Sequence, residues 1–587
     1  MAKPKNNAAQ GQLLKKAPLP KMPEGYYSGD KPNPNLRKFV EEHLKEHPYD
    51  PATDKYDVSA FDKPIETTKA TAIYNMHTYW SKKPHDAIRE YIRHYTKPGD
   101  LVLDPFCGSG GTALAALMEG RKAIAIDRSP AATFITKNYC TPVDVEELQK
   151  AFEELKAKVK PEMDWLYETR CDRCDGKATT GYTVYSQVFQ CSRCMEKVAL
   201  FDCVEIEGET AAGKPKKVSI CPQCHKKGHE EEISTRAEKF GSISVLVSYL
   251  CENGCKPARG ERRHNDPSRK KREHFEKYDL GKLREIEGKD VPHWFPPHKM
   301  MNMEDDSLPW GDKWRAGTSN FRTVADLFTK RNLWALAALL AACRASNLRE
   351  ALLFAFQSNV LSGTTMQQYR EAGGGFAKGT YYVPQVFIER EQLGCFSRKI
   401  GDIMSAQAEM QAQPMSAQVA ISTQSSTSLN ECRANVVDYI FTDPPYADKV
   451  QYGELNFVWE AWLGFDTCWH DEEIIVNGVR GKTEADWAAM MRQAMCECFR
   501  VLKPGRWLSL CYHDTSEGTW SLVQDIMAEA GFVVDKGDAA LFIDTGQKSY
   551  NEASPQQAAG YPSDSAEYLE YPRKFGGRSL EYLIHHR

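Results

Sequence analysis

Residues 101–127, LVLDPFCGSGGTALAALMEGRKAIAID, decide the fold of this 587-residue chain. The apolar run 101–103 predicts a buried strand, and the glycine-rich turn behind it leads into an Ala/Leu-rich helix. A second buried strand at 123–126 ends in Asp127, 17 residues after Gly110. A glycine turn between strand and helix lets the backbone approach a ligand closely, and an acid at this distance can bind ribose hydroxyls. The complete unit predicts a Rossmann-like nucleoside site.

The second decisive stretch is Asp443-Pro444-Pro445-Tyr446, which comes after the apolar run 437–441. A strand that ends this way presents a carboxylate and an aromatic ring at the carboxyl edge of a sheet, where open α/β sheets bind ligands. The prolines fix φ and remove two N–H donors, so the local carbonyls are held rigidly and can accept hydrogen bonds. Acceptors beside a stacking ring suit a planar base with an exocyclic amino group. Taken alone, the tetrapeptide fits an ordinary Pro-Pro turn equally well.

The rest of the core alternates helices and strands. Ahead of the first strand, apolar side chains recur at helical spacing, at Ile88, Tyr91, Ile92 and Tyr95, with Pro84 in the first turn. From residue 418 onward the pattern predicts strands at 418–421, 507–512 and 581–585 and helices at 484–502 and 517–530. This alternation predicts a doubly wound α/β sheet.

Length and composition indicate a soluble protein of about three to four domains, or one core with large insertions. A net charge of −4 creates no global attraction for nucleic acid, so such binding would need local basic patches. Residues 1–30 carry no apolar segment of a secretory signal. The longest apolar run, 333–343, is far shorter than the ~20 residues of a membrane span. We expect a cytoplasmic protein without a membrane segment.

Three motifs together carry a family resemblance: HTYWSKKP at 77–84, LDPFCGSG at 103–110 and DPPY at 443–446. They resemble the amino-group DNA methyltransferases, which use S-adenosylmethionine to methylate adenine N6 or cytosine N4. The longer stretch 442–463, TDPPYADKVQYGELNFVWEAWL, and the cysteine-rich segment resemble adenine-specific DNA methylases with a zinc ribbon. The resemblance covers roughly residues 75–140 and 415–587.

The resemblance assigns roles residue by residue. It implies that S-adenosylmethionine is held by Asp104, Pro105, Phe106, Gly108, Ser109 and Gly110. It implies further that Asp127 binds the ribose and that Lys83 and Pro84 flank the amino-acid end of the cofactor. The implied catalytic residues are Asp443, Pro444, Pro445 and Tyr446.

The residue chemistry supports this assignment. The exocyclic amine of adenine is a poor nucleophile because its lone pair is delocalised into the ring. Hydrogen bonds from both amino protons, to the Asp443 carboxylate and the Pro444 carbonyl, would push that nitrogen toward sp³ and aim it at the methyl group. A base in a duplex must flip out to reach such a site, and Tyr446 would stack on it. Orientation would supply most of the rate, with no catalytic metal.

The implied function is methylation of adenine N6 in double-stranded DNA, with restriction or defence-system proteins as candidate partners. Three alternatives stay open: methylation of cytosine N4, methylation of an amino group in RNA, and a zinc-ribbon DNA-binding protein whose methyltransferase core is not catalytic. The DPPY form favours adenine by resemblance. The intact acid, prolines and ring argue against a non-catalytic core.

A long insertion separates Asp127 from Asp443 by 316 residues. A helix at 143–159 leads into it, and four cysteine pairs follow: Cys171 and Cys174, Cys191 and Cys194, Cys221 and Cys224, and Cys251 and Cys255. This spacing predicts one or two structural Zn²⁺ ions held by thiolates, and we expect the first two pairs to form one site and the last two another. Interleaved pairs, or His225 or His229 in place of a thiolate, stay open. Cys203 is left over as a core residue.

A basic segment at 256–277 carries nine Lys/Arg against four acids. Its candidate nucleic-acid contacts are Arg259, Arg262, Arg263, Arg269, Lys270, Lys271 and Arg272. Phosphate contacts and a solvated charged loop are equally good explanations.

These observations predict five parts. They are a flexible tail at 1–30, the cofactor-binding half of the core at 31–142, a zinc-ribbon insertion at 143–290, a helical insertion at 291–412 and the catalytic half of the core at 413–587. We expect the zinc-ribbon insertion to recognise the DNA target.

Overall fold

A six-stranded sheet lies at the centre of the computed structural model, in the order β13-β3-β2-β14-β15-β17. The strands from β13 to β15 run parallel, and β17 pairs antiparallel with β15 at one edge. Their bounds are β2 Leu101–Asp104, β3 Lys122–Asp127, β13 Val419–Thr423, β14 Val437–Thr442, β15 Leu502–Tyr512 and β17 Tyr582–His586. A mixed α/β fold with a central parallel sheet fits the predicted Rossmann-like core.

The structure describes residues 22–209, 215–235, 238–255, 270–300, 321–370, 375–376, 381–415, 418–478, 480–512, 517–533, 543–544 and 582–586. Among these residues, no helix is both long and apolar enough to cross a membrane.

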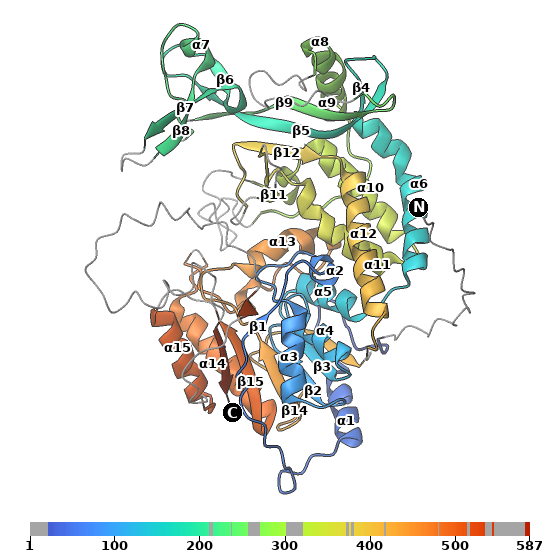
Figure 1. The fold of residues 1–587 in the computed structure, drawn as a ribbon, viewed down its shortest axis with the longest axis vertical. Coiled ribbons are helices and arrows are strands. Elements are labelled where there is room, and N and C mark those ends of the chain that lie inside the picture. Colours follow the sequence, from blue (N-terminus) through green and yellow to red (C-terminus); the bar gives the residue numbers. More distant parts are fainter. Residues whose placement is uncertain are drawn as a thin grey trace, which may run out of the picture.

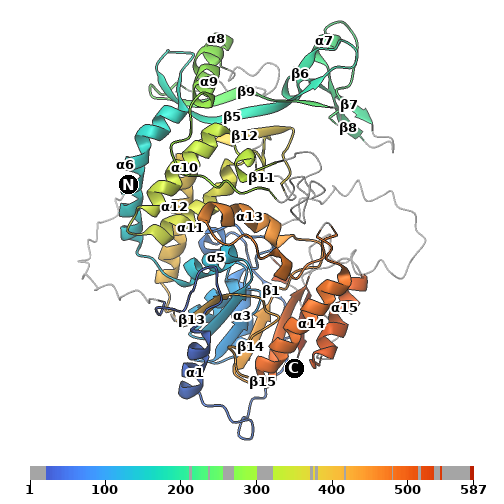
Figure 2. The same cartoon turned by 180° about the vertical axis from the view of Figure 1, so that it is seen from behind.

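Helices cover both faces of the sheet. In β14, Val437 and Ile440 pack on one face, and Tyr439 and Phe441 pack on the other. The first face is covered by α1 Leu36–Glu46, α14 Glu484–Val501 and α15 Glu517–Glu529 (Figure 2). The second is covered by α3 His85–Tyr95 and α4 Gly111–Met118. Burial on two sides explains why the strands are almost continuously apolar.

The segment that follows residue 21 covers the free edge of the sheet. The backbone N–H of Ile421 donates to the Tyr26 carbonyl at 2.9 Å, and Tyr27 forms a parallel bridge with Ile421. Asn33 donates from its side-chain amide to the Ile421 carbonyl at 3.0 Å. An edge strand has unpaired backbone groups, and this segment satisfies them. The prediction of a flexible tail at 1–30 is therefore wrong for 22–30, and residues 1–21 lie outside the described residues.

A layer of helices stands on the core (Figure 1). It comprises α6 Val145–Tyr167, α10 Lys330–Arg344, α11 Arg349–Val360 and α12 Gln392–Gln411. The helix α13 Tyr452–Leu463 and the helix α5 Pro130–Cys140 join it to the core, and both contact α11. Trp459 and Trp462 on α13 are fully buried and belong to the core between these layers.

A long antiparallel sheet, which we call the platform, lies across the helices (Figure 1). Its main strands are β5 Lys177–Gln190, β9 Lys239–Cys251 and β12 Val386–Arg390, with the short strands β4 Glu168–Arg170, β6 Lys197–Ala199, β10 Gln367–Gln368 and β11 Gly375–Phe376. A hairpin of β7 Val204–Glu209 and β8 Pro215–Ile220 lies at one end. Because β12 pairs with β5, the predicted insertions 143–290 and 291–412 share one sheet.

A buried ion pair ties the helices to the platform. Arg331 on α10 pairs with Glu389 on β12, and both side chains are almost wholly buried. Arg331 Nη2 also donates to Thr183 Oγ1 on β5 at 2.7 Å. Three elements that are distant in sequence are thus fixed by charge-assisted hydrogen bonds.

Candidate active site and metal centres

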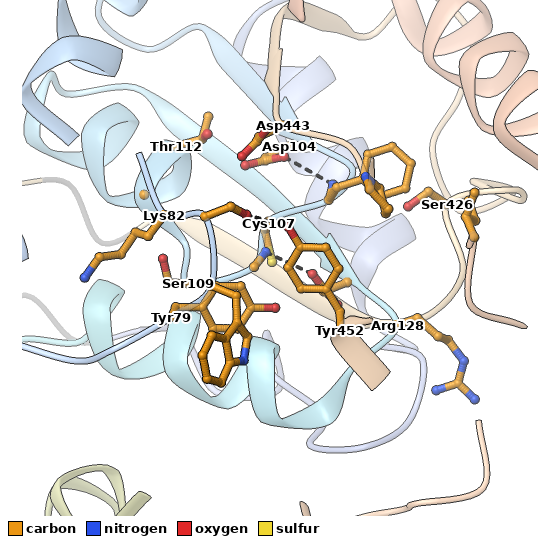
Figure 3. Close-up of a pocket in the computed structure, with 18 of the residues that line it drawn as sticks. Tyr79, Lys82, Asp104, Cys107, Ser109, Thr112, Arg128, Ser426, Asp443 and Tyr452 are labelled. Atoms are coloured by element: carbon orange, nitrogen blue, oxygen red, sulfur yellow. Dashed lines mark hydrogen bonds between the residues drawn. The ribbon is translucent and has the colours of Figure 1, made fainter. Parts of the chain in front are cut away.

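A cavity lies at the carboxyl edge of the parallel strands (Figure 3). Its lining comes from the ends of β2, β3, β13 and β14, from the loop 79–83 ahead of α3, and from the segment 469–474. The fold thus places the two decisive stretches of sequence around one space. This edge is where open α/β sheets bind ligands.

Most of the predicted site residues line this cavity. Of the predicted cofactor residues, the lining includes Lys83, Asp104, Phe106, Gly108, Ser109 and Asp127. The residues that do not line it are Pro84, the N-cap of α3, Gly110, the N-cap of α4, and Pro105, whose carbonyl accepts from Ser426 Oγ. Of the predicted catalytic residues, Asp443 and Pro445 line the cavity, and Pro444 and Tyr446 do not.

The turn after β2 requires glycine at two positions. Gly108 has φ +49°, and a Cβ there would lie 2.8 Å from the ring of Tyr79. Gly110 has φ +79°, and a Cβ there would lie 2.9 Å from the Cα of Thr136. Both the left-handed backbone and the close packing exclude larger residues. The glycines let the loop turn sharply beneath the cavity.

Two buried carboxylates flank this turn. Asp127 Oδ2 accepts from the Gly108 N–H and Oδ1 from the Ser129 N–H, both at 2.9 Å, which holds the carboxylate at the end of β3. Asp104 Oδ1 accepts from the Phe106 N–H at 3.1 Å and from Thr442 Oγ1 at 3.0 Å. Burial raises the pKa of Asp104 to about 7 and that of Asp127 to about 6.

Asp443 forms a compact group with Tyr446 and Lys83. Lys83 Nζ lies 3.3 Å from Asp443 Oδ2 and donates to the Tyr446 hydroxyl at 3.0 Å. The Tyr446 hydroxyl in turn donates to Asp443 Oδ1. The Tyr446 ring is buried among apolar side chains, with 4% of the residue exposed. In this arrangement the predicted base-stacking ring faces Asp443 rather than the cavity.

Two non-glycine residues with positive φ stand beside this group. Ser81 has φ 54° and Ala447 has φ 47°, each at a cost of about 1–2 kcal/mol. Ser81 lies between the aromatic pair Tyr79 and Trp80 and the two lysines that follow. The Ala447 N–H donates to the Pro445 carbonyl at 3.1 Å, so the chain turns tightly directly after Tyr446.

Sequence reasoning missed several lining residues. Arg128 donates from Nε and Nη2 to the carboxylate of Glu472 at 2.9 and 3.0 Å. Tyr452 also lines the cavity, and its hydroxyl is hydrogen-bonded to Ser81 Oγ. Because Arg128 directly follows Asp127, the predicted ribose acid, its position in the sequence could have predicted it as a lining residue. Glu472 ends the short 3₁₀ helix His470–Glu472, which carries no motif, so no local signal could have found it.

The eight cysteines form two clusters of four. One contains Cys171, Cys174, Cys251 and Cys255, and the other contains Cys191, Cys194, Cys221 and Cys224, with the sulfurs of each within 4.8 Å of one another. The clusters group the pairs in the interleaved order and not in the predicted order, in which neighbouring pairs in sequence share a site. The physical reason is the antiparallel register of β5 and β9, which places Cys251 opposite Ala178, near the start of β5. Cys203 is a buried core residue, as predicted.

The cluster geometry fits a structural metal site. The Asp175 N–H donates to the Cys171 carbonyl at 2.9 Å, and the Met195 N–H donates to the Cys191 carbonyl at 3.0 Å, so the two turns are alike. Burial opposes a thiolate at Cys171, yet N–H groups of the turn lower its pKa to about 6. Four thiolates with no open position are the ligand set of a structural Zn²⁺. The 14 residues of β5 separate the clusters by about 45 Å.

The basic segment is only partly described. Lys270 is buried, with its Nζ 2.7 Å from Asp279 Oδ2, so its prediction as a nucleic-acid contact is wrong. Its Nζ also donates to Thr169 Oγ1, so its partners lie in the protein interior. Lys271 and Arg272 are exposed, and Arg272 Nε donates to Glu276 at 2.7 Å. Four predicted contacts lie outside the described residues: Arg259, Arg262, Arg263 and Arg269.

Comparison with known proteins agrees with this geometry. Residues 3–138 match the DNA methylase family N6_N4_Mtase. The matched part contains loop 79–83, the glycine turn and Asp127, and it supports a DNA methyltransferase.

Curated relatives agree with the match to a DNA methylase family. The chain is 28% identical over 101 residues to the type II methyltransferase M.MjaII of Methanocaldococcus jannaschii, which is 17% of this chain and 19% of the relative. It is 32% identical over 93 residues to M.BsoBI of Geobacillus stearothermophilus, 15% of this chain and 18% of the relative. It is 48% identical over 50 residues to M1.MboII of Moraxella bovis, 8% of this chain and 19% of the relative. The chain thus spans about a fifth of the length of these relatives.

Proposed function

We propose that the chain is a DNA methyltransferase that transfers a methyl group from S-adenosylmethionine to N6 of a flipped adenine. The observation that carries this proposal is the position of Asp443. This carboxylate ends β14 in the same cavity that holds the glycine turn and Asp127. The relatives are named as type II methyltransferases, which favours DNA over RNA as the acceptor. The DPPY sequence supports adenine over cytosine by resemblance.

The cavity fits the cofactor. Asp127 offers a fixed carboxylate for ribose hydroxyls, and the loop at Gly108 leaves the space that a Cβ would fill. Asp104 and Lys83 offer opposite charges for the ammonium and carboxylate of an amino acid. S-adenosylmethionine supplies, when bound, a methyl group on a positively charged sulfur.

The residues of the chain orient and activate the acceptor nitrogen. The Asp443 carboxylate can accept one amino proton of the base, and the carbonyl of Pro444 can accept the other. Among the described residues, no hydrogen bond goes to that carbonyl. Both contacts pull the nitrogen toward sp³ and fix its direction, and Asp443 can take the proton that the nitrogen loses. Orientation of this kind supplies a large part of the rate in enzymes.

The aromatic side chains of the cavity suit a base that has left the duplex. Tyr79 and Tyr452 are stacked with their ring centroids 6.2 Å apart, and both line the cavity with Trp80. Base flipping costs unstacking energy, which aromatic contacts in the enzyme offset. Tyr446 remains the predicted stacking partner, and it would have to turn from Asp443 to reach the base.

We propose further that the platform binds two structural Zn²⁺ ions and contacts the DNA. The two cysteine clusters lie near its ends, and the exposed Lys271 and Arg272 lie beside the first of them. Metal at both ends would fix the long strands β5 and β9 as one rigid surface. The expected role is structural because each cluster supplies four thiolates.

Transfer of a radioactive methyl group in vitro tests the proposed function. The full chain is incubated with labelled S-adenosylmethionine and either plasmid DNA or total RNA, and each product is treated with deoxyribonuclease or ribonuclease. We expect label that only deoxyribonuclease releases, and none with Asp443→Asn. Asp62→Asn, an exposed acid of the same type, is the control and should retain activity. Label that only ribonuclease releases would overturn the choice of DNA.

A further inference from the structure

Among the described residues, three basic residues line the cavity, and they differ in what holds them. Lys82 Nζ donates to the His77 carbonyl at 2.7 Å and to the Tyr74 carbonyl, so it braces the loop. In Figure 3 its side chain points away from Asp443. Arg128 forms a two-point pair with Glu472. Lys83 is the one of these three that contacts Asp443.

The contact between Lys83 and Asp443 conflicts with methyl transfer. The amino nitrogen gains positive charge as it accepts the methyl group, and Asp443 is the group that favours this charge. An ammonium 3.3 Å from the same carboxylate opposes it, because like charges repel strongly in a site shielded from water. Lys83 also holds the Tyr446 hydroxyl, which itself occupies Asp443 Oδ1. In this arrangement both oxygens of Asp443 are engaged by Lys83 and Tyr446.

The position of the cavity shows what could draw Lys83 away. Asp127 ends β3, Asp443 ends β14, and β2 lies between these strands. A nucleoside held at Asp127 that presents its methyl group toward Asp443 has its amino-acid tail near the end of β2 and Lys83. That tail carries a carboxylate. Lys83 has an exposed fraction of only 6%, so a carboxylate that reaches it meets a poorly hydrated ammonium.

We propose that Lys83 is a positioning residue that exchanges partners when the cofactor binds. In the arrangement described above its ammonium pairs with Asp443 and Tyr446. The carboxylate of the cofactor takes over the ammonium, which frees the oxygens of Asp443 for the base and allows Tyr446 to turn. The cofactor must then bind before the target base is held productively. This inference rests on the proposed function, because it assumes that the cavity binds S-adenosylmethionine.

Calorimetric titration of the full chain with S-adenosylhomocysteine tests the exchange without catalysis and without a known target sequence. The variants are Lys83→Met, Asp443→Asn and the double variant, with Lys83→Arg as the charge-conserving control. The second ligand is 5′-methylthioadenosine, which has the nucleoside but no amino-acid tail. Thermal unfolding of each variant shows that it is folded.

We expect Lys83→Met to weaken S-adenosylhomocysteine about tenfold or more, the usual scale for a lost charge-assisted hydrogen bond. Binding of 5′-methylthioadenosine should change less than about twofold. Asp443→Asn should tighten S-adenosylhomocysteine severalfold, because Lys83 no longer has to leave a carboxylate, and this gain should vanish in the double variant. Lys83→Arg should retain most of the affinity.

Two results would overturn the exchange. One is an equal effect of Asp443→Asn with and without Lys83, since the two residues would then not compete for one ammonium. The other is an equal loss of both ligands in Lys83→Met, which would mean that Lys83 only supports the cavity. If the unaltered chain binds neither ligand, the proposed function itself fails, and that outcome is distinct from the first two.

Discussion

Replacement of Gly110 by alanine tests whether the turn after β2 is as tightly constrained as its geometry indicates. A Cβ at Gly110 would lie 2.7 Å from Thr136 Cγ2 and 2.9 Å from Thr136 Cα, and the backbone has φ +79°. The left-handed conformation costs a non-glycine residue about 1–2 kcal/mol. The overlap adds about 1–3 kcal/mol, because the Cα of Thr136 belongs to α5 and cannot move alone. We therefore expect a loss of about 2–5 kcal/mol in the free energy of unfolding.

Gly481→Ala is a matched control. Gly481 has φ +67°, and a Cβ there would meet nothing within 4 Å, so this variant should lose only the conformational cost of about 1–2 kcal/mol. Urea-induced unfolding of both variants gives the comparison, and titration with S-adenosylhomocysteine shows whether the site suffers. Gly110→Ala should unfold at lower urea than Gly481→Ala and should bind the ligand more weakly. Equal urea midpoints would refute the argument from close packing.

Three further predictions concern the metal, a buried acid and the buried ion pair. Metal analysis of the unaltered chain should give two Zn²⁺ per chain. The variant Cys191→Ser should hold about one Zn²⁺, and the control Cys203→Ser should hold two. If freshly purified protein contains no zinc, both proposed metal sites are wrong. Burial raises the pKa of Glu460 from 4.5 to about 8, so the native state should lose stability as the pH rises between these values. Glu460→Gln has no carboxyl group at this position and should not lose this stability. The difference in free energy of unfolding, variant minus unaltered chain, should therefore increase by a few kcal/mol from pH 5 to pH 8. A difference that does not change with pH would refute the raised pKa of Glu460. Glu389→Gln should lower the free energy of unfolding by about 3–5 kcal/mol because it leaves the buried Arg331 charge without its carboxylate partner. Asp164→Asn removes an exposed ion pair and should lower the free energy of unfolding by less than about 1 kcal/mol. Equal losses of stability in urea unfolding would count against a stabilising role for the buried pair.

Local sequence signals predicted the core well because the physics there is local. The turn after β2 needs glycines, and the strands need apolar runs, whatever the rest of the chain does. The same holds for Asp443, whose place after a buried strand fixed its position at the carboxyl edge. The separation of 316 residues from Asp127 to Asp443 did not disturb this, because both acids lie at the ends of strands of the same sheet.

Predictions that depended on tertiary contacts were less successful. Cysteine spacing shows that thiolates come in pairs, but the pairing of the pairs depends on the register of β5 and β9. Lys270 belongs to a basic run of the sequence, yet its side chain is buried and pairs with the buried Asp279 carboxylate. Glu472 is joined to the cavity by a tertiary contact, its pair with Arg128, which is 344 residues away in the sequence. The contact of Lys83 with Asp443 likewise joins residues that no spacing rule relates.

Nucleoside mass spectrometry of DNA tests the central claim most directly. DNA is taken from a methylation-deficient host that expresses the full chain, Asp443→Ala or the control Asp62→Asn. The account predicts N6-methyladenine with the unaltered chain and with Asp62→Asn, and none with Asp443→Ala. N4-methylcytosine alone would contradict the choice of adenine, and N6-methyladenine that persists in Asp443→Ala would contradict the role of Asp443.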